Sequence, residues 1–421
     1  MPTPAAPTAP NVPAAARARE YSGVGTEEPD YALTEPLDPD MAGVFRRLPA
    51  DDLAYRDRAR AFVQDEVLPV IDGYWDRADY PLHLLRRLGG LDLVRDGVDV
   101  PGHPPMSLLA ACLVQCELSR GDGSVSTMVG VQGGLALRSV AMLGSDAQRE
   151  RWLEPLAAVT ELGAFALTEP THGSDSVSLE TRARRVDGGY VLQGEKKWIG
   201  NGSTGGVTVV WARGDDGHVH GFLVPQDTPG YDGRTIEGKA ALRAIWQAHV
   251  HLDDVFVPTD AMLPGGTSFT DTAEVLAATR LGVAWGALGH ATACYETAVH
   301  YTRQRVQFGR PLAASQVVQE RLARMLSSLT SLQALLMSLT RLAAEETVSG
   351  AQASLAKYTA TRTARVIASE ARDLLGGNGI LLRHRVVRHF ADVEAIHTYE
   401  GTETVQALLI GRDITGISAF A

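Results

Sequence analysis

The hydrophobic periodicity of this 421-residue chain changes twice, and the order of the changes limits the folds that it can adopt. From about residue 51 to residue 162, apolar residues such as Phe62, Val63 and Val67 recur mostly three or four positions apart, as in amphipathic helices. The middle of the chain instead holds short runs of β-branched residues separated by Gly, Asp and Pro, which predicts β-strands. Helical spacing then returns in the C-terminal third.

The C-terminal third carries a long apolar stripe, formed by Leu322, Met325, Leu326, Leu329, Leu332, Leu335, Leu339 and Leu342. This stripe extends over roughly six turns, which is longer than an average globular helix. Several long helices with short connections predict an antiparallel bundle. We therefore expect an α+β protein with a disordered N-terminal arm (1–45), an N-terminal α-helical domain (46–162), a middle β-barrel domain (163–270) and a C-terminal four-helix bundle domain (271–421).

Charge and cysteine content argue against several classes of protein. The formal net charge is −11, which disfavours binding to nucleic acid or to an anionic membrane. The three cysteines, Cys112, Cys116 and Cys294, are too few for a disulfide framework and indicate a reducing compartment. No stretch reaches the roughly 18 uninterrupted apolar residues of a membrane span, and the proline-rich start lacks the apolar core of a signal peptide. We therefore expect a cytoplasmic protein without a membrane or nucleic-acid partner.

Two patterns that could indicate a ligand are incomplete. Gly376-Gly377-Asn378-Gly379 follows a predicted helix, so it is not the strand-to-helix phosphate loop of a Rossmann unit. The pairs His218 and His220, and His249 and His251, each point to one face of a strand, but no carboxylate or cysteine at a suitable spacing completes a site. We expect no metal site.

Two segments of the middle region have the composition of a binding surface. Residues 164–175, AFALTEPTHGSD, pass from apolar residues to small hydroxyls and turn formers. They form either a turn into the β domain or a loop that lines a flat cofactor. Trp198-Ile199-Gly200-Asn201 is either an anchor in the core or a platform for an aromatic ring system.

Two C-terminal segments carry charged side chains near predicted helix ends. Three arginines lie within residues 303–310, where they form either a solvated basic turn or a phosphate site. Glu400 lies just before a helix for which Thr402 is a suitable N-cap. Burial would raise the pKa of Glu400, and the helix N-terminus would lower it. Glu400 is therefore either a general base or a surface residue.

Taken together, these segments resemble the acyl-CoA dehydrogenase family from about residue 45 to the C-terminus. The motifs FALTEPTHGSD, GGNGI and TYEGT occur in the order of that family. The segments VVWAR, QFGRPLAASQ and ARDLLGGNGI resemble glutaryl-CoA dehydrogenases and peroxisomal short-chain acyl-CoA oxidases. The resemblance implies an acyl-CoA dehydrogenase-like fold, a homotetramer, and FAD bound between the middle and C-terminal domains.

The resemblance also implies roles for individual residues. It assigns contacts with FAD to Phe165, Leu167, Thr168, Trp198, Ile199, Gly200 and Thr402, and contacts with the FAD of a neighbouring subunit to Arg305, Gln316, Gly376 and Gly377. Ser174 matches a position near the CoA arm, Arg280 an arginine beside the base, and Gly401 the residue beside the thioester. Glu400 matches the carboxylate that removes the α-proton of an acyl-CoA while FAD receives the β-hydride, which gives a trans-2-enoyl-CoA.

Several alternatives remain open. Electrons could pass to electron-transfer flavoprotein or, as in an acyl-CoA oxidase, to O2, and the acyl group could be carried by CoA or by a carrier protein. The C-terminal residues ISAFA are not a peroxisomal address, which favours the dehydrogenase. A flavin monooxygenase, a nitroalkane oxidase or a non-enzymatic flavoprotein is disfavoured because Glu400 and the flavin motifs are both present.

One departure from the resemblance concerns the substrate. Glutaryl-CoA dehydrogenases carry a Glu and an Arg-Ser pair in the stretch that matches CELSRGDGSVSTMVG, where this chain has Ser119, Ser126 and Thr127. Without the arginine, the distal carboxylate of glutaryl-CoA has no evident partner, and its burial would be costly. We therefore expect oxidation without decarboxylation.

Overall fold

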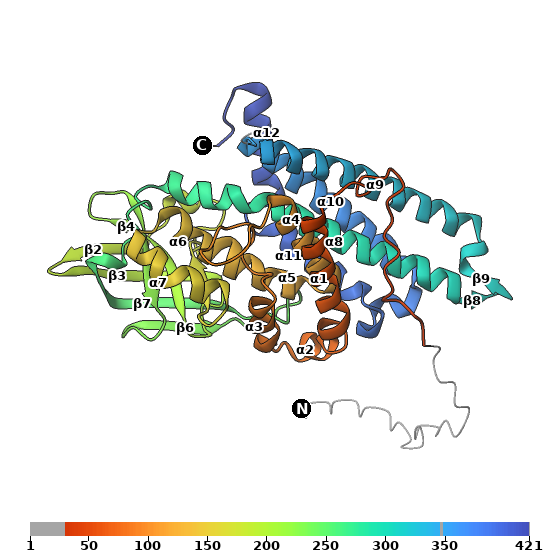
Figure 1. Ribbon diagram of the computed structural model, residues 1–421, viewed down its shortest axis with the longest axis horizontal. Helices are drawn as coiled ribbons and strands as arrows, with labels where there is room; N and C mark the ends of the chain where they lie inside the picture. Colours follow the sequence, from red (N-terminus) through yellow and green to blue (C-terminus); the bar gives the residue numbers. More distant parts are fainter. Residues whose placement is uncertain (1–29, 346–347, 421) are drawn as a thin grey trace, which may run out of the picture.

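The computed structural model describes residues 30–345 and 348–420. The curled sheet lies at one end of an elongated molecule, and the long C-terminal helices extend to the other end (Figure 1). The N-terminal helices pack between the sheet and this bundle (Figure 1). The predicted order of helical, β and helical regions is confirmed.

The N-terminal region is helical throughout its main elements. These are α1 (Ala50–Phe62), α2 (Ile71–Arg77), α3 (Leu82–Gly90), α4 (Leu108–Gly121), α5 (Gly123–Val129), α6 (Arg138–Leu143) and α7 (Asp146–Ala157), with π-helical turns at Val63–Val67 and Gly130–Leu137. Ser145 caps α7 in a reciprocal capping box with Gln148. Cys112 is buried in α4, and Cys116 lies on the same helix.

The middle region forms one curled sheet. Its strands are β1 (Gly163–Ala166), β2 (Arg182–Val186), β3 (Gly189–Gly200), β4 (Val207–Gly214), β5 (Val219–Pro225), β6 (Tyr231–Thr235) and β7 (Gln247–Pro258), in the order β1-β4-β2-β3-β7-β6, with β5 also on β4. The pairs β1–β4 and β2–β4 are parallel, and the other pairs are antiparallel. Two bulges interrupt the long β3–β7 pair, and the second lies between Lys197 and Ile199.

The C-terminal region is a helical bundle. Its helices are α8 (Phe269–Gln304), α9 (Gln316–Glu345), α10 (Gly350–Leu374), α11 (Val386–Thr398) and α12 (Glu403–Thr415), and the short hairpin β8 (Val306–Gln307) and β9 (Arg310–Pro311) lies between α8 and α9. The predicted apolar stripe is on α9, where its residues Leu329, Leu332 and Leu339 enter the main core. By length and hydropathy α9 could cross a membrane, but a single such helix whose apolar face lies in a core is weak support for a span.

The predicted disorder of residues 1–45 is wrong for residues 30–45, whereas residues 1–29 lie outside the described residues. Tyr31 packs its ring against Tyr301 with 4.9 Å between ring centroids. Leu33 is buried in the bundle core. The backbone N–H of Leu37 donates to the Glu296 carboxylate at 2.9 Å. These contacts join residues more than 250 positions apart, which is why local composition did not predict them.

Candidate active site

The loop between α11 and α12 holds Glu400 in a conformation that few residues adopt. Glu400 has φ +51° and Gly401 has φ +87°, both in the left-handed region. A Cβ on Gly401 would lie 2.6 Å from Nε2 of Gln406, so space as well as φ favours glycine there. Thr402 caps α12 by accepting a hydrogen bond from the Val405 N–H at 3.3 Å, as predicted.

Two side chains fix the backbone of this loop from outside. The ammonium of Lys357 on α10 donates to the carbonyls of Tyr399 and Gly401, which flank Glu400. The Gln406 amide donates to the carbonyls of Glu400 and Gly401 at 2.9 and 3.1 Å. Sequence reasoning missed Lys357, because its partners lie 42 and 44 residues further along the chain. The residues next to Lys357 in the sequence therefore give no indication of these contacts.

The Glu400 carboxylate is partly buried and lies among both hydrogen-bond donors and charges. Thr279 on α8 donates its hydroxyl to the carboxylate at 2.8 Å. Desolvation raises the pKa of Glu400 above its usual value, whereas Lys357, the Thr279 hydroxyl and Arg280 each lower it. Burial lowers the pKa of Lys357 to about 8, although the nearby Glu400 raises it. A carboxylate with a raised pKa beside two cations is suited to receive a proton.

Arg280 follows Thr279 on α8 and is one of the cations that act on Glu400. Its buried Nε has no hydrogen-bond partner within the described residues. Burial lowers the pKa of Arg280, and the attraction of Glu400 raises it. A buried guanidinium with an unpaired donor beside the carboxylate is suited to bind a polar or anionic group.

The predicted flavin segments lie at the ends of β1 and β3. Trp198 has φ +66° and is 55% exposed, so its indole is available to a planar ligand. The side chains of Phe165, Leu167 and Ile199 are buried in the protein core, so only their backbone could contact a cofactor. The Thr168 carbonyl accepts from the Lys197 N–H at 2.8 Å, which joins the two segments.

A buried ion pair also holds the first flavin segment in place. Lys196, on the inner face of β3, donates to the Leu167 carbonyl at 3.0 Å and to the Glu169 carboxylate at 2.9 Å. Glu169 also accepts from the N–H groups of Glu180 and Thr181. The neighbouring Ser174 is exposed on the same loop.

One helical segment joins the flavin segments to the Glu400 loop. The side chain of Thr127 on α5 interacts with Tyr399, the residue before Glu400. One turn later, the Val131 side chain lies so close to Gly200 that a Cβ there would meet it at 2.7 Å. The end of β3 and the candidate base therefore lie against the same short stretch of chain.

Two of the side chains at the positions where this chain differs from glutaryl-CoA dehydrogenases belong to a neutral hydrogen-bonded chain. The Ser119 hydroxyl donates to Ser126 at 2.7 Å, and Ser126 donates to the Gln115 side chain at 2.7 Å. Asp96 interacts with Gln115 and forms an ion pair with Arg138 at 3.0 Å. Burial raises the pKa of Asp96, and Arg138 lowers it. The Arg138 guanidinium is therefore already paired with a carboxylate of the chain itself.

The remaining predicted cofactor residues lie at the far end of the bundle. Arg305 follows α8, Gln316 begins α9, and Gly376 and Gly377 follow α10. The Asn378 amide donates to Tyr301 near the end of α8 at 3.1 Å, which places these segments together. About 26 residues separate Thr279 from Arg305 along α8, or roughly 39 Å of helix. One chain therefore does not bring this group to its own Glu400.

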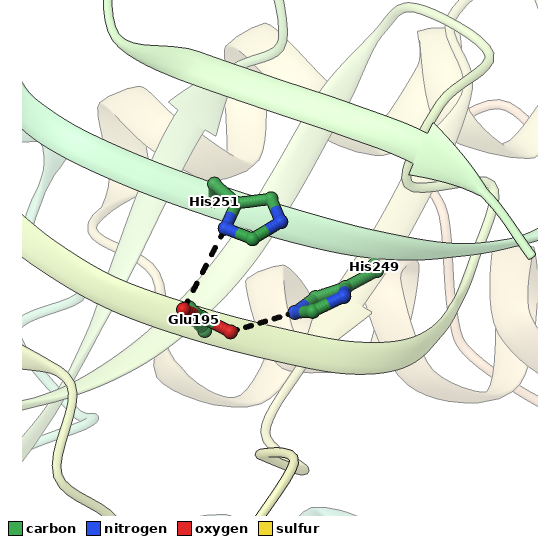
Figure 2. A group of neighbouring side chains, drawn as sticks. All are labelled: Glu195, His249 and His251. Atoms are coloured by element: carbon green, nitrogen blue, oxygen red, sulfur yellow. Dashed lines mark hydrogen bonds and ion pairs between the residues drawn. The ribbon is translucent and has the colours of Figure 1, made fainter.

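The prediction that no carboxylate accompanies the histidines His249 and His251 is wrong. Glu195 on β3 contacts both imidazoles, with O–N distances of 2.8 and 3.7 Å (Figure 2). Sequence spacing did not show this group, because Glu195 comes from another strand and lies 54 residues before His249. His220 instead bonds to Asp216 on its own hairpin.

Comparison with known proteins agrees with this arrangement over nearly the whole chain. Models of the three domains of acyl-CoA dehydrogenases match it, with the N-terminal domain at residues 49–160, the middle domain at 164–255 and the C-terminal domain at 266–415. The chain belongs to the acyl-CoA dehydrogenase family. The predicted family and three-domain fold are confirmed.

Individual members of the acyl-CoA dehydrogenase family cover most of the chain. The mitochondrial short-chain specific acyl-CoA dehydrogenase of Homo sapiens is 32% identical over 359 residues, which cover 83% of this chain and 87% of that protein. A crystal structure of glutaryl-CoA dehydrogenase from Mycobacterium smegmatis has a TM-score of 0.88 at 39% identity and covers 90% of this chain and 98% of that chain. A structure of a glutaryl-CoA dehydrogenase from the same organism in complex with FADH2 has a TM-score of 0.87 at 37% identity and covers 89% and 97%.

The acyl-CoA dehydrogenase family binds FAD, so this chain is a flavoprotein. It is an oxidoreductase that acts on a CH–CH bond.

Proposed function

We propose that the protein oxidises an acyl-CoA thioester to the trans-2-enoyl-CoA without decarboxylation, and that Glu400 is the base. The observation that carries this proposal is the geometry of Glu400. Its carboxylate is partly buried, its loop is fixed by Lys357 and Gln406, and a hydroxyl and two cations lie beside it. Such a fixed base is needed because the α-proton of a thioester is only weakly acidic.

The chain would contribute to the reaction in two ways. Glu400 would take the α-proton, and its backbone N–H would donate to the thioester oxygen, where negative charge develops. FAD, when bound, would supply the acceptor for the β-hydride. Lys357 and Arg280 would keep the carboxylate ionised before it accepts the proton, since each lowers its pKa.

The fit of the chain to FAD rests on the exposed indole of Trp198 and on the nearby backbone. Trp198 would pack on the isoalloxazine ring, while the backbone of Phe165, Leu167, Thr168, Ile199 and Gly200 and the capping residue Thr402 would line the cofactor. Ser174 and Gly401 would meet the CoA arm and the thioester. Arg305, Gln316, Gly376 and Gly377 would serve a second copy, because their end of the bundle is remote from Glu400.

We further propose a homotetramer. A site that needs residues from both ends of α8 requires at least two copies. The C-terminal helix α12 stands out from the body of the molecule (Figure 1), and Gln406 is its one buried residue. Ile414 and Ile417 at the end of this helix are 77% and 74% exposed, and they would give another copy an apolar surface to cover.

The absence of decarboxylation is proposed from the neutral chain Ser119–Ser126–Gln115 and from the Asp96–Arg138 pair. A substrate carboxylate placed near these residues would lose water, the Arg138 guanidinium is already paired with Asp96, and Asp96 would repel it. We therefore propose a straight or modestly modified acyl chain as the substrate.

The natural electron acceptor is proposed to be electron-transfer flavoprotein. O2 and an acyl group on a carrier protein are the alternatives to be separated by experiment.

The test is reduction of the holoenzyme by a panel of acyl-CoA thioesters under nitrogen. Butyryl-CoA or a close homologue is expected to bleach the visible flavin absorbance and to reduce a dye, with little O2 uptake in air. Glutaryl-CoA is expected to yield no crotonyl-CoA and no CO2. Release of CO2 from glutaryl-CoA would refute the substrate assignment, and failure of every acyl-CoA to bleach the flavin would refute the function.

A further inference from the structure

We propose that the outer face of the middle sheet holds a transition-metal site formed by Glu195, His249 and His251, with Zn2+ as its occupant. Figure 2 shows the three side chains gathered on one face, with the Glu195 carboxylate joined to both histidines. The site is separate from Glu400 and does not depend on the proposed reaction.

The alternation of β7 places both histidines on the same side. Ala248, Val250 and Leu252 are buried on the inner face of this strand, so His249 and His251 project from the outer face. Glu195 lies directly opposite His251 in the β3–β7 register. Partners in an antiparallel register share a face, so the backbone alone places the carboxylate beside the histidines.

The distances are close to those of a metal site. Glu195 Oε2 lies 2.8 Å from His249 Nε2, and Oε1 lies 3.7 Å from His251 Nδ1. One ligand atom from each residue lies within 4.8 Å of the other two. Zinc bonds of about 2.0–2.2 Å in tetrahedral geometry place ligand atoms roughly 3.4 Å apart. Small side-chain rotations are therefore enough to bring all three onto one ion.

The chemistry of the ligands favours a first-row transition metal. Two imidazoles and one carboxylate suit Zn2+, whereas Mg2+ and Ca2+ prefer oxygen ligands. The side chains of Glu195, His249 and His251 are 50%, 29% and 35% exposed, so an ion can enter from solvent and keep a water as its fourth ligand.

Neighbouring charges on this face are mixed. Asp232 on β6 lies opposite His251 in the register and would add negative charge, although it forms an ion pair with Arg234 at 2.6 Å. Lys197 lies opposite His249, but its ammonium is directed over the Trp198 ring, 5.6 Å from the centroid. The cations near the site therefore already have partners.

Metal binding here would act on the strand that leads into the flavin segment. Glu195 immediately precedes Lys196, whose ammonium holds Leu167 and Glu169 on the other face of β3. The bulge between Lys197 and Ile199 follows at once. An ion that joins β3 to β7 at this point is expected to stabilise the middle domain against thermal unfolding.

The test measures Zn2+ binding to untagged, chelator-treated holoenzyme by calorimetry, together with the visible spectrum of the Co2+-loaded protein. One Zn2+ per chain is expected. His249→Ala, His251→Ala and Glu195→Gln should each weaken binding at least roughly tenfold, since even outer partners of metal ligands contribute 10–100-fold. His218→Ala removes an exposed histidine from the turn between β4 and β5 and is the matched control, with no change expected.

Circular dichroism of each variant checks that the exposed substitutions leave the fold intact. Absence of stoichiometric Zn2+ binding, or equal binding by the His249→Ala/His251→Ala double variant, would overturn the proposal. Equal binding of Mg2+ or Ca2+ would also overturn it, because those ions do not need the imidazoles.

Discussion

At the scale of single residues, the reactivity of Glu400 is set by the balance between burial and nearby positive charge. Burial raises its pKa, and Lys357 is the largest of the opposing influences. Activity should therefore rise with pH as Glu400 loses its proton, because only the carboxylate form can act as a base.

Lys357→Met is expected to shift this rise in kcat/KM to higher pH, since it removes the cation that most strongly lowers the pKa of Glu400. It also leaves two loop carbonyls without a donor. Lys239→Met is the matched control, because Lys239 is a half-buried lysine that also donates to two carbonyls, those of Leu242 and Ile245. The measurement is the pH profile of dye reduction for both variants. If kcat/KM of Lys357→Met rose over the same pH range as that of the wild type, Lys357 would not be lowering the pKa of Glu400, and the prediction would be contradicted.

At the scale of elements, the α11–α12 loop depends on its glycine. Gly401→Ala is expected to destabilise the protein by about 1–2 kcal/mol through the left-handed backbone alone, and to add strain against Gln406. Activity should fall with it, because Glu400 is the adjacent residue. Chemical denaturation and dye reduction measure the two effects.

Gly411→Ala provides the control for this change. Gly411 lies within α12, and no atom lies within 4 Å of an added Cβ. Alanine there is expected to stabilise the helix by about 0.5–1 kcal/mol. If both alanines had the same effect, the special role of Gly401 in the loop would be refuted.

The elements also show what sequence could and could not predict. The Thr402 cap and the stripe on α9 depend on residues a few positions apart, and both were predicted correctly. The Lys357 contacts, the Glu195–His249 pair and the packing of residues 30–45 depend on partners 42 or more positions away. Local composition carries no information on such pairs. For the Glu400 loop, the family resemblance supplied what periodicity could not.

At the scale of the whole molecule, the length of α8 separates the two groups of proposed FAD residues. Arg305→Ala is expected to weaken FAD binding by roughly 10–100-fold, because a hydrogen bond to a charged group contributes about 1.5–3 kcal/mol. Arg303→Ala, two residues earlier and exposed, is the control and should retain FAD. Fluorescence titration of the apoprotein with FAD gives both affinities. If Arg305→Ala and Arg303→Ala bound FAD with equal affinity, Arg305 would not contact FAD, and the proposed sharing of the cofactor site between copies would be contradicted.

The most direct test of the central claim is anaerobic reduction of Glu400→Gln by an acyl-CoA that reduces the wild-type enzyme. The amide keeps the size of the side chain and can still accept the Thr279 hydrogen bond, but it cannot take a proton. The variant is expected to keep bound FAD and to bleach the flavin at least roughly 10²–10⁴-fold more slowly. Bleaching at a near wild-type rate by the FAD-loaded variant would contradict the assignment of Glu400 as the base.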